Sequence, residues 1–125
     1  MNVYKIVLIA SSENEALKAF DMAKSFNCEG ITCTRSWSTG FEILNDRATK
    51  GYAIKMLSQK LRAKQTIAVG DYENDIQMIE MADIGYAVGN ATEKVKSAAD
   101  KVTKPVWESA MANIIEDLKK SDKPR

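Results

Sequence analysis

The segment Ile67–Asn90, IAVGDYENDIQMIEMADIGYAVGN, constrains the fold more than any other part of the chain. A short apolar run ends in a glycine and an aspartate, an amphipathic run follows, and a second apolar run begins at Ile84. Two short apolar runs joined by a helical pattern predict two parallel strands connected by a crossover helix. Parallel strands are buried on both faces, so this segment also requires covering helices on either side of its sheet.

The rest of the second half continues this alternation. A helix is expected to begin at Lys50, with Thr49 as its N-cap, and the complete order from there is α-β-α-β-α. Asn90 has capping-box spacing to Glu93, which predicts a further helix, and Trp107 begins a core-facing stripe on the last helix. Strands are predicted at residues 66–69 and 84–88 and a helix at 73–81, and the charged tail, residues 119–125, is expected to fray.

The first half is predicted to form a smaller α+β unit in the order β-α-β-β. Ser12 and Glu15 have the spacing of a capping box, which predicts the start of a helix that continues to about Phe26. The β-branched run Val3–Ala10 before this helix is expected to be a buried strand. Further strands are predicted at residues 30–34 and 41–44, and the polar segment 45–49 suggests a boundary between units 1–48 and 49–125.

Composition excludes several classes of function. The 125 residues contain no histidine, which rules out histidine-based zinc sites and histidine-dependent catalytic triads. Cys28 and Cys33 are too few for a zinc site or a disulfide framework, and reduced thiols suit a cytoplasmic protein. The net charge of +1 argues against nucleic acid as the main partner, and no apolar run approaches the roughly 20 residues that a membrane helix needs.

Oxygen-bearing side chains follow the first apolar run of the constraining segment. Asp71 is the first polar side chain beyond that strand, and Asn74 and Asp75 lie where the next helix is expected to begin. Ligands of parallel α/β sheets gather at the carboxyl ends of the strands, and a helix start favours anions. Carboxylates beside an anion site suggest a magnesium ion that bridges protein oxygens and a phosphate, with the ammonium group of Lys50 as a phosphate partner.

The same cluster of oxygen-bearing side chains could have a purely structural role or bind a different ion. Asp, Asn and Glu are common at strand-to-helix turns simply as caps, so the cluster alone leaves a purely structural role open. A calcium-binding EF-hand is excluded, because the sixth loop position holds Ile76 instead of glycine and the twelfth holds Ala82 instead of glutamate.

Two stretches resemble the C-terminal part of haloacid-dehalogenase-type hydrolases, most closely the Cof-type, sugar-phosphatase-like branch. They are TKGYAIKML at residues 49–57 and TIAVGDYENDIQMIEMADIGYAVGNATEKVKSAADKVT at residues 66–103. The resemblance implies that Lys50 and Asn74 bind the substrate phosphate and that Asp71 and Asp75 serve the magnesium ion. It implies a partial Rossmann-like core over residues 49–125 and, more weakly, a partial cap domain over residues 1–48.

The nucleophile of that family has no counterpart in this chain. The family begins catalysis at an Asp-x-Asp motif, whose first aspartate attacks phosphorus and whose second acts as acid and base. No two aspartates here are spaced two residues apart; they lie at positions 21, 46, 71, 75, 83, 100, 117 and 122. Ser11 and Ser12 follow an apolar strand, as the family's Ser/Thr motif does, but their place in the cap-like segment argues against that role.

Three hypotheses for function therefore stand. The first is a magnesium-dependent phosphomonoesterase, with a phosphosugar as the implied substrate class, represented by a portion that is inactive by itself. The second is a non-catalytic interaction module of the same fold. The third is a truncated piece of a complete enzyme. The strand at residues 66–69 is expected to have an open edge, which predicts pairing with a second copy or with a partner chain, unless the strand at residues 3–10 folds back to cover it.

Overall fold

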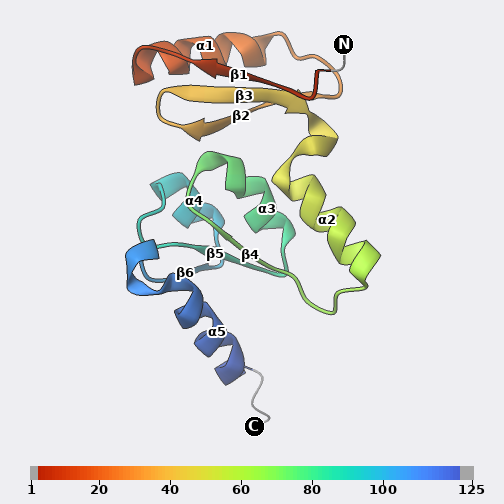
Figure 1. The fold of residues 1–125 in the computed structure, drawn as a ribbon, viewed down its shortest axis with the longest axis vertical. Coiled ribbons are helices and arrows are strands. Elements are labelled where there is room, and N and C mark those ends of the chain that lie inside the picture. The colour runs from red at the N-terminus through yellow and green to blue at the C-terminus, as the bar shows by residue number, and fades with distance from the viewer. Residues whose placement is uncertain (1–2, 122–125) are drawn as a thin grey trace.

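The computed structural model describes residues 3–121, which form two three-stranded sheets with helices against them (Figure 1). The upper unit in Figure 1 holds the antiparallel sheet and one helix, and the lower unit holds the parallel sheet with its helices. The helix α2, Lys50–Leu61, runs down one side of the molecule and connects them. This arrangement confirms the predicted α/β class with a parallel sheet and covering helices.

The first sheet has the strand order β1-β3-β2. Both of its strand pairs are antiparallel, and α1 lies against β2 and β3 on one face. Phe20 of α1 meets Phe41 edge-on at a centroid distance of 5.4 Å, which forms the centre of this small core. The elements of this unit are β1 (Lys5–Ile9), α1 (Glu13–Ser25), β2 (Ile31–Trp37), β3 (Gly40–Asn45) and the 3-10 turn η1 (Asp46–Ala48).

The second sheet is parallel and has the order β4-β5-β6. Its core is built of small and branched side chains, among which Ile79 and Val95 are almost completely buried. Thr66, just before β4, donates its N–H and its hydroxyl to Asp83, and these hydrogen bonds hold the pKa of Asp83 below its usual value. The elements are β4 (Ile67–Gly70), η2 (Glu73–Asp75), α3 (Ile76–Met81), β5 (Ile84–Ala87), α4 (Glu93–Ala98), β6 (Lys101–Val102), η3 (Val106–Glu108) and α5 (Ala110–Ser121).

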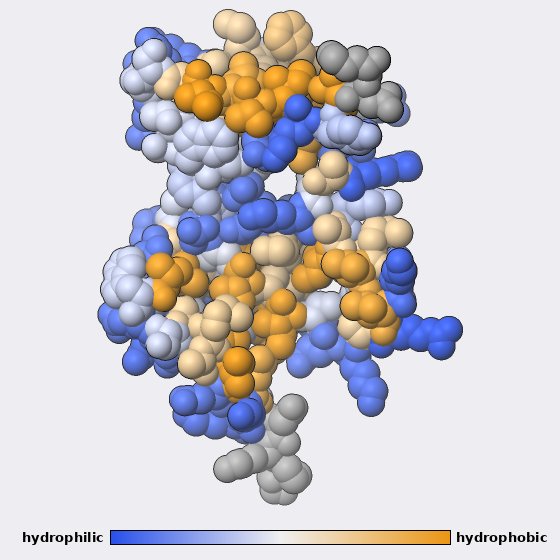
Figure 2. Space-filling view, viewed as in Figure 1, coloured by the Kyte–Doolittle hydropathy of each residue, from blue (hydrophilic) through white to orange (hydrophobic). Residues whose placement is uncertain are grey.

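The first strand differs from its prediction in burial. All five residues of β1 are exposed, although the sequence predicted a buried strand; Ile9 retains 76% of its accessible surface. β1 is an edge strand, and α1 packs mainly against β2 and β3, so the apolar side chains of β1 remain exposed (Figure 2). The alternative in which this strand covers the edge of β4 is therefore wrong: among the described strands, β4 pairs with β5 alone.

Three other predictions need correction. The helix after β5 is capped by Thr92, and Asn90 instead accepts the N–H of Val106 at 3.0 Å. Trp107, which was predicted to begin the core-facing stripe of the last helix, lies in η3 and is 72% exposed. The chain turns at Ser109 before α5 begins, and within α5 the side chain of Ile114 is buried. The short strand β6 was not predicted, and α5 continues through Ser121; the last four residues of the tail, 122–125, lie outside the described part.

Within residues 3–121, every helix is too short or too polar to cross a membrane.

Candidate functional site

The candidate site residues lie at the carboxyl end of β4, where the chain turns from Gly70 through Asp71 into η2. This turn is called the Asp71 corner below. Gly70 ends the strand, and its backbone lies directly against the side chain of Asp75, which returns from η2. A Cβ atom at position 70 would collide with the Cβ of Asp75 and lie 2.8 Å from its Cγ. Glycine is therefore required here by close approach, and its small size lets the Asp75 carboxylate fold back over the end of the strand.

Asp75 connects two parts of this corner. Its Oδ2 accepts the backbone N–H of Asp71 at 3.1 Å, and its Oδ1 accepts a hydrogen bond from the Lys50 ammonium at 2.5 Å. The Asp75 side chain is only 7% exposed, whereas the Lys50 side chain is half exposed. A buried carboxylate with both oxygens engaged is well compensated, so Asp75 fixes the corner and orients the lysine.

Lys50 reaches this corner because of the way α2 begins. Thr49 is the N-cap, as predicted, and its Oγ1 accepts the N–H of Tyr52 at 3.1 Å. The cap fixes the first turn of the helix, and Gly51 in that turn is buried beside Gln77 of the neighbouring segment. The close packing of α2 against α3 thus brings the Lys50 side chain to the end of β4.

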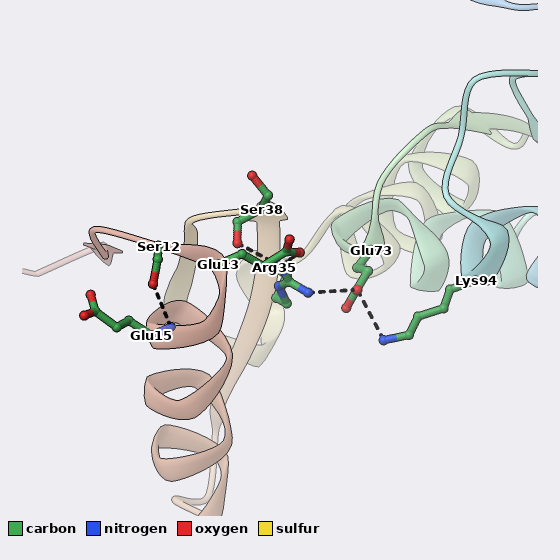
Figure 3. A network of polar contacts seen from close by, with 7 residues as sticks. All are labelled: Ser12, Glu13, Glu15, Arg35, Ser38, Glu73 and Lys94. Atoms are coloured by element: carbon green, nitrogen blue, oxygen red, sulfur yellow. Dashed lines mark hydrogen bonds and ion pairs between the residues drawn. The ribbon is translucent and has the colours of Figure 1, made fainter.

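Asn74, in the same 3-10 turn as Asp75, is held from the other unit of the molecule. Its amide Nδ2 donates to the hydroxyl of Ser36 in β2 at 3.3 Å. Its neighbour Glu73 lies between two cations: the guanidinium of Arg35 is 3.5 Å away and the ammonium of Lys94 is 3.3 Å away (Figure 3). Two consecutive residues of β2 therefore contact two consecutive residues of η2.

A hollow of about 630 Å³ lies between the first sheet and the segments that carry Lys50 and Asn74. Its sheet side includes Thr32, Thr34 and Glu42, and its other side includes α3. Hydroxyl, carboxylate and amide groups thus surround a space of the size that small-molecule sites have. The hollow could hold the polar remainder of a ligand whose anionic group lies near Lys50.

The carboxylates of Asp71 and Asp75 could supply some of the oxygen ligands of a magnesium ion, but not a complete coordination shell. Magnesium takes six oxygen ligands in near-octahedral geometry. Asp71 is exposed, but both oxygens of Asp75 already accept hydrogen bonds. In the described part of the chain, no three His, Cys, Asp or Glu side chains lie together as metal ligands.

Hydrogen bonds thus join three of the residues that the sequence selected, Lys50, Asp75 and Asp71. The fourth, Asn74, lies in the same turn as Asp75 and lines the hollow with Lys50, while its side chain bonds Ser36. Ser12 lies elsewhere and caps α1: its hydroxyl accepts the N–H of Glu15, whose carboxylate accepts the N–H of Ser11. Sequence patterns did not identify Arg35 and Ser36, because their contacts with η2 join residues 38 positions apart. An arginine followed by a serine in a short strand is too common a pair to predict a contact with a distant turn.

The family model for haloacid dehalogenase-like hydrolases matches residues 1–115. The chain belongs to this family. The relatives include the phosphatase YwpJ of Bacillus subtilis, which is 39% identical over 94 residues, covering 74% of this chain and 33% of that protein. The putative phosphatase YxeH of Bacillus subtilis is 34% identical over 116 residues, covering 91% of this chain and 43% of that protein.

Solved structures of family members superpose closely on this fold. A haloacid dehalogenase-like hydrolase from Bacillus subtilis has a TM-score of 0.83 at 33% identity, over 90% of this chain and 40% of that one. The subclass IIB sugar phosphatase BT4131 has a TM-score of 0.79 at 26% identity, over 95% of this chain and 44% of that one. This chain therefore spans less than half the length of these relatives.

Proposed function

We propose that this chain supplies the phosphate-binding part of a magnesium-dependent phosphomonoesterase that acts on phosphosugars. The observation that carries the proposal is the Lys50 ammonium, held by buried Asp75 at the carboxyl end of β4, in a family whose relatives are named phosphatases. In this proposal the ammonium neutralises phosphate charge, and the amide of Asn74 donates a hydrogen bond to a phosphate oxygen. The hollow beside them, which both polar and apolar side chains line, takes the sugar.

The proposal predicts that inorganic phosphate binds and that Lys50→Ala weakens binding by at least about tenfold. A hydrogen bond to a charged group contributes about 1.5–3 kcal/mol, and 1.4 kcal/mol corresponds to a factor of ten. Chemical-shift titration of the chain with inorganic phosphate measures both affinities. Lys55→Ala, an exposed lysine of the same helix, is the matched control and should leave the affinity unchanged. Equal affinities of Lys50→Ala and the unmodified chain would refute the assignment of Lys50.

Magnesium enters the proposal as an ion that Asp71 and Asp75 ligate in part. The remaining oxygens would come from phosphate, water and further protein groups, so the chain alone should bind the ion more weakly than micromolar. Calorimetric titration with magnesium, repeated on Asp71→Asn, tests this assignment. Binding at micromolar concentration or tighter would show that the donor set is more complete than proposed.

A second candidate, an interaction module, is favoured by the open edge of β4. β4 is an edge strand that pairs with β5 alone among the described strands, which leaves the N–H and C=O groups of its other edge without a strand partner there. A groove of about 610 Å³ lies beside this edge. Apolar side chains including Val69, Met78 and Met111 line it, together with Lys50, Asp71 and Asp75 of the candidate site. We propose that a second copy of the chain pairs there, because a two-fold dimer closes both edges at once.

This pairing predicts a concentration-dependent dimer that Ile67→Lys abolishes: Ile67 is 37% exposed on β4, and pairing of the two strands would bury the added charge. Sedimentation over a concentration series measures the association. Val102→Lys is the control: Val102 is 54% exposed on β6, the opposite edge strand of the same sheet. A monomer at every concentration, with the amides of residues 67–69 protected from exchange, would contradict the dimer.

A further inference from the structure

The contact between β2 and η2 depends on an irregularity in the strand. The register of β2 and β3 is regular from Ile31 to Arg35 and then shifts, so that Trp37, not Ser36, faces Gly40. This is a β-bulge, in which one extra residue is inserted into β2. In a regular strand, neighbouring side chains point to opposite faces of the sheet, whereas a bulge re-aims them.

The bulge lets two consecutive side chains reach the same turn. Arg35 contacts Glu73 through Nη1, and Ser36 accepts a hydrogen bond from the side chain of Asn74. Glu73 and Asn74 directly precede Asp75 and follow the Asp71 corner. The first unit therefore holds, through the side chains of Arg35 and Ser36, the segment that carries three of the proposed site residues. These two contacts are called the grip below.

Arg35 is an unusual residue to bury for stability alone. Its side chain is 7% exposed, and its Nη2 donates to Glu13 at 3.2 Å and to the carbonyl of Ser38 at 2.9 Å. Its Nε is buried and has no hydrogen-bond partner within the described residues. An unsatisfied buried donor costs free energy, and apolar replacements of buried ion pairs are often neutral or stabilising. The grip on Glu73 is a contact that an apolar side chain could not replace (Figure 3).

We propose that Arg35 and Ser36 are positioning residues for the phosphate site: they hold η2 in place through Glu73 and Asn74. The inference rests on the proposed function only where it concerns phosphate; the grip itself can be measured without any ligand. Ser36 accepts the amide of Asn74 and so fixes which way that amide points. Arg35 fixes the neighbouring backbone by holding the Glu73 carboxylate.

Three variants separate positioning from folding. Ser36→Ala removes the acceptor of the Asn74 amide, and Ser36→Thr keeps the hydroxyl in a residue that strands accommodate well. Arg35→Met keeps an unbranched apolar stem and removes the grip. This substitution leaves no buried carboxylate without a counter-charge, because the side chain of Glu13 is 59% exposed to solvent and Glu73 still pairs with Lys94. We expect the melting temperature of each variant to stay within a few degrees of the unmodified chain.

The readout is nuclear magnetic resonance of the chain without ligand, followed by titration with inorganic phosphate. We expect backbone order parameters at residues 72–75 to fall in Ser36→Ala and Arg35→Met, the Asn74 side-chain amide signals to shift, and Ser36→Thr to restore both. Phosphate affinity should fall severalfold in the two disruptive variants and recover in Ser36→Thr. Unchanged order parameters and unchanged Asn74 signals in both would overturn the inference. Loosened turns without phosphate binding by any variant would support the grip and refute the proposed function.

Discussion

Purified chain is expected to release no phosphate above the buffer rate from p-nitrophenyl phosphate or from a panel of phosphosugars, with magnesium present. Lys50 and Asn74 can neutralise and orient a phosphate, but hydrolysis in this family type needs a carboxylate that attacks phosphorus. Asp75 is a poor candidate, because both of its oxygens accept hydrogen bonds from positively polarised donors. Phosphomonoesters hydrolyse extremely slowly without a catalyst, so binding alone gives no measurable turnover.

Asp71 is the residue that could contradict this expectation. It is exposed at the corner and follows Gly70 directly. Turnover that survives a second purification and disappears in Asp71→Ala would mean that this carboxylate acts as nucleophile or base. Activity that persists unchanged in Asp71→Ala would point to a contaminating phosphatase, which makes this variant the necessary control.

Gly70→Ala is expected to lower the free energy of unfolding by roughly 3 kcal/mol and the melting temperature by about 10 °C. The new methyl group would overlap the Cβ of Asp75, and the nearby Oδ2 would lie only 2.9 Å from it. The carboxylate must then move, which breaks its hydrogen bonds with the Asp71 N–H and the Lys50 ammonium. Phosphate binding should be lost together with stability, because one carboxylate supports both.

Gly30→Ala is the matched control for this substitution. Gly30 has a φ of +73°, and an added Cβ there would meet no atom within 4 Å. Its cost is therefore the left-handed backbone alone, about 1 kcal/mol, with no effect on phosphate binding. Urea unfolding of both variants, with phosphate titration, gives the comparison. Equal losses of stability in the two would show that the close approach to Asp75 is relieved by a small backbone shift.

Local sequence patterns determined the elements around the site. Thr49 caps α2 because a threonine oxygen placed before a helix satisfies a free N–H group, and that interaction spans three residues. The apolar runs at β4 and β5 were recognisable because parallel strands need apolar side chains on both faces. Asp71, Asn74 and Asp75 were found because they follow a buried strand directly. Lys50 was found because a lysine that begins the preceding helix suits a phosphate partner, and the resemblance to a known family implied the same role.

The tertiary structure alone decided which of these groups meet, and how exposed they are. The hydrogen bond of Lys50 to Asp75 joins residues 25 positions apart, and the grip of Ser36 on Asn74 joins residues 38 apart. No local pattern encodes such contacts, because they arise from the packing of α2 on α3 and of the bulged β2 against η2. The exposure of β1 has the same cause: its apolar residues fit a buried strand, but side chains are buried only when other elements cover the faces of the strand, and α1 packs mainly against β2 and β3.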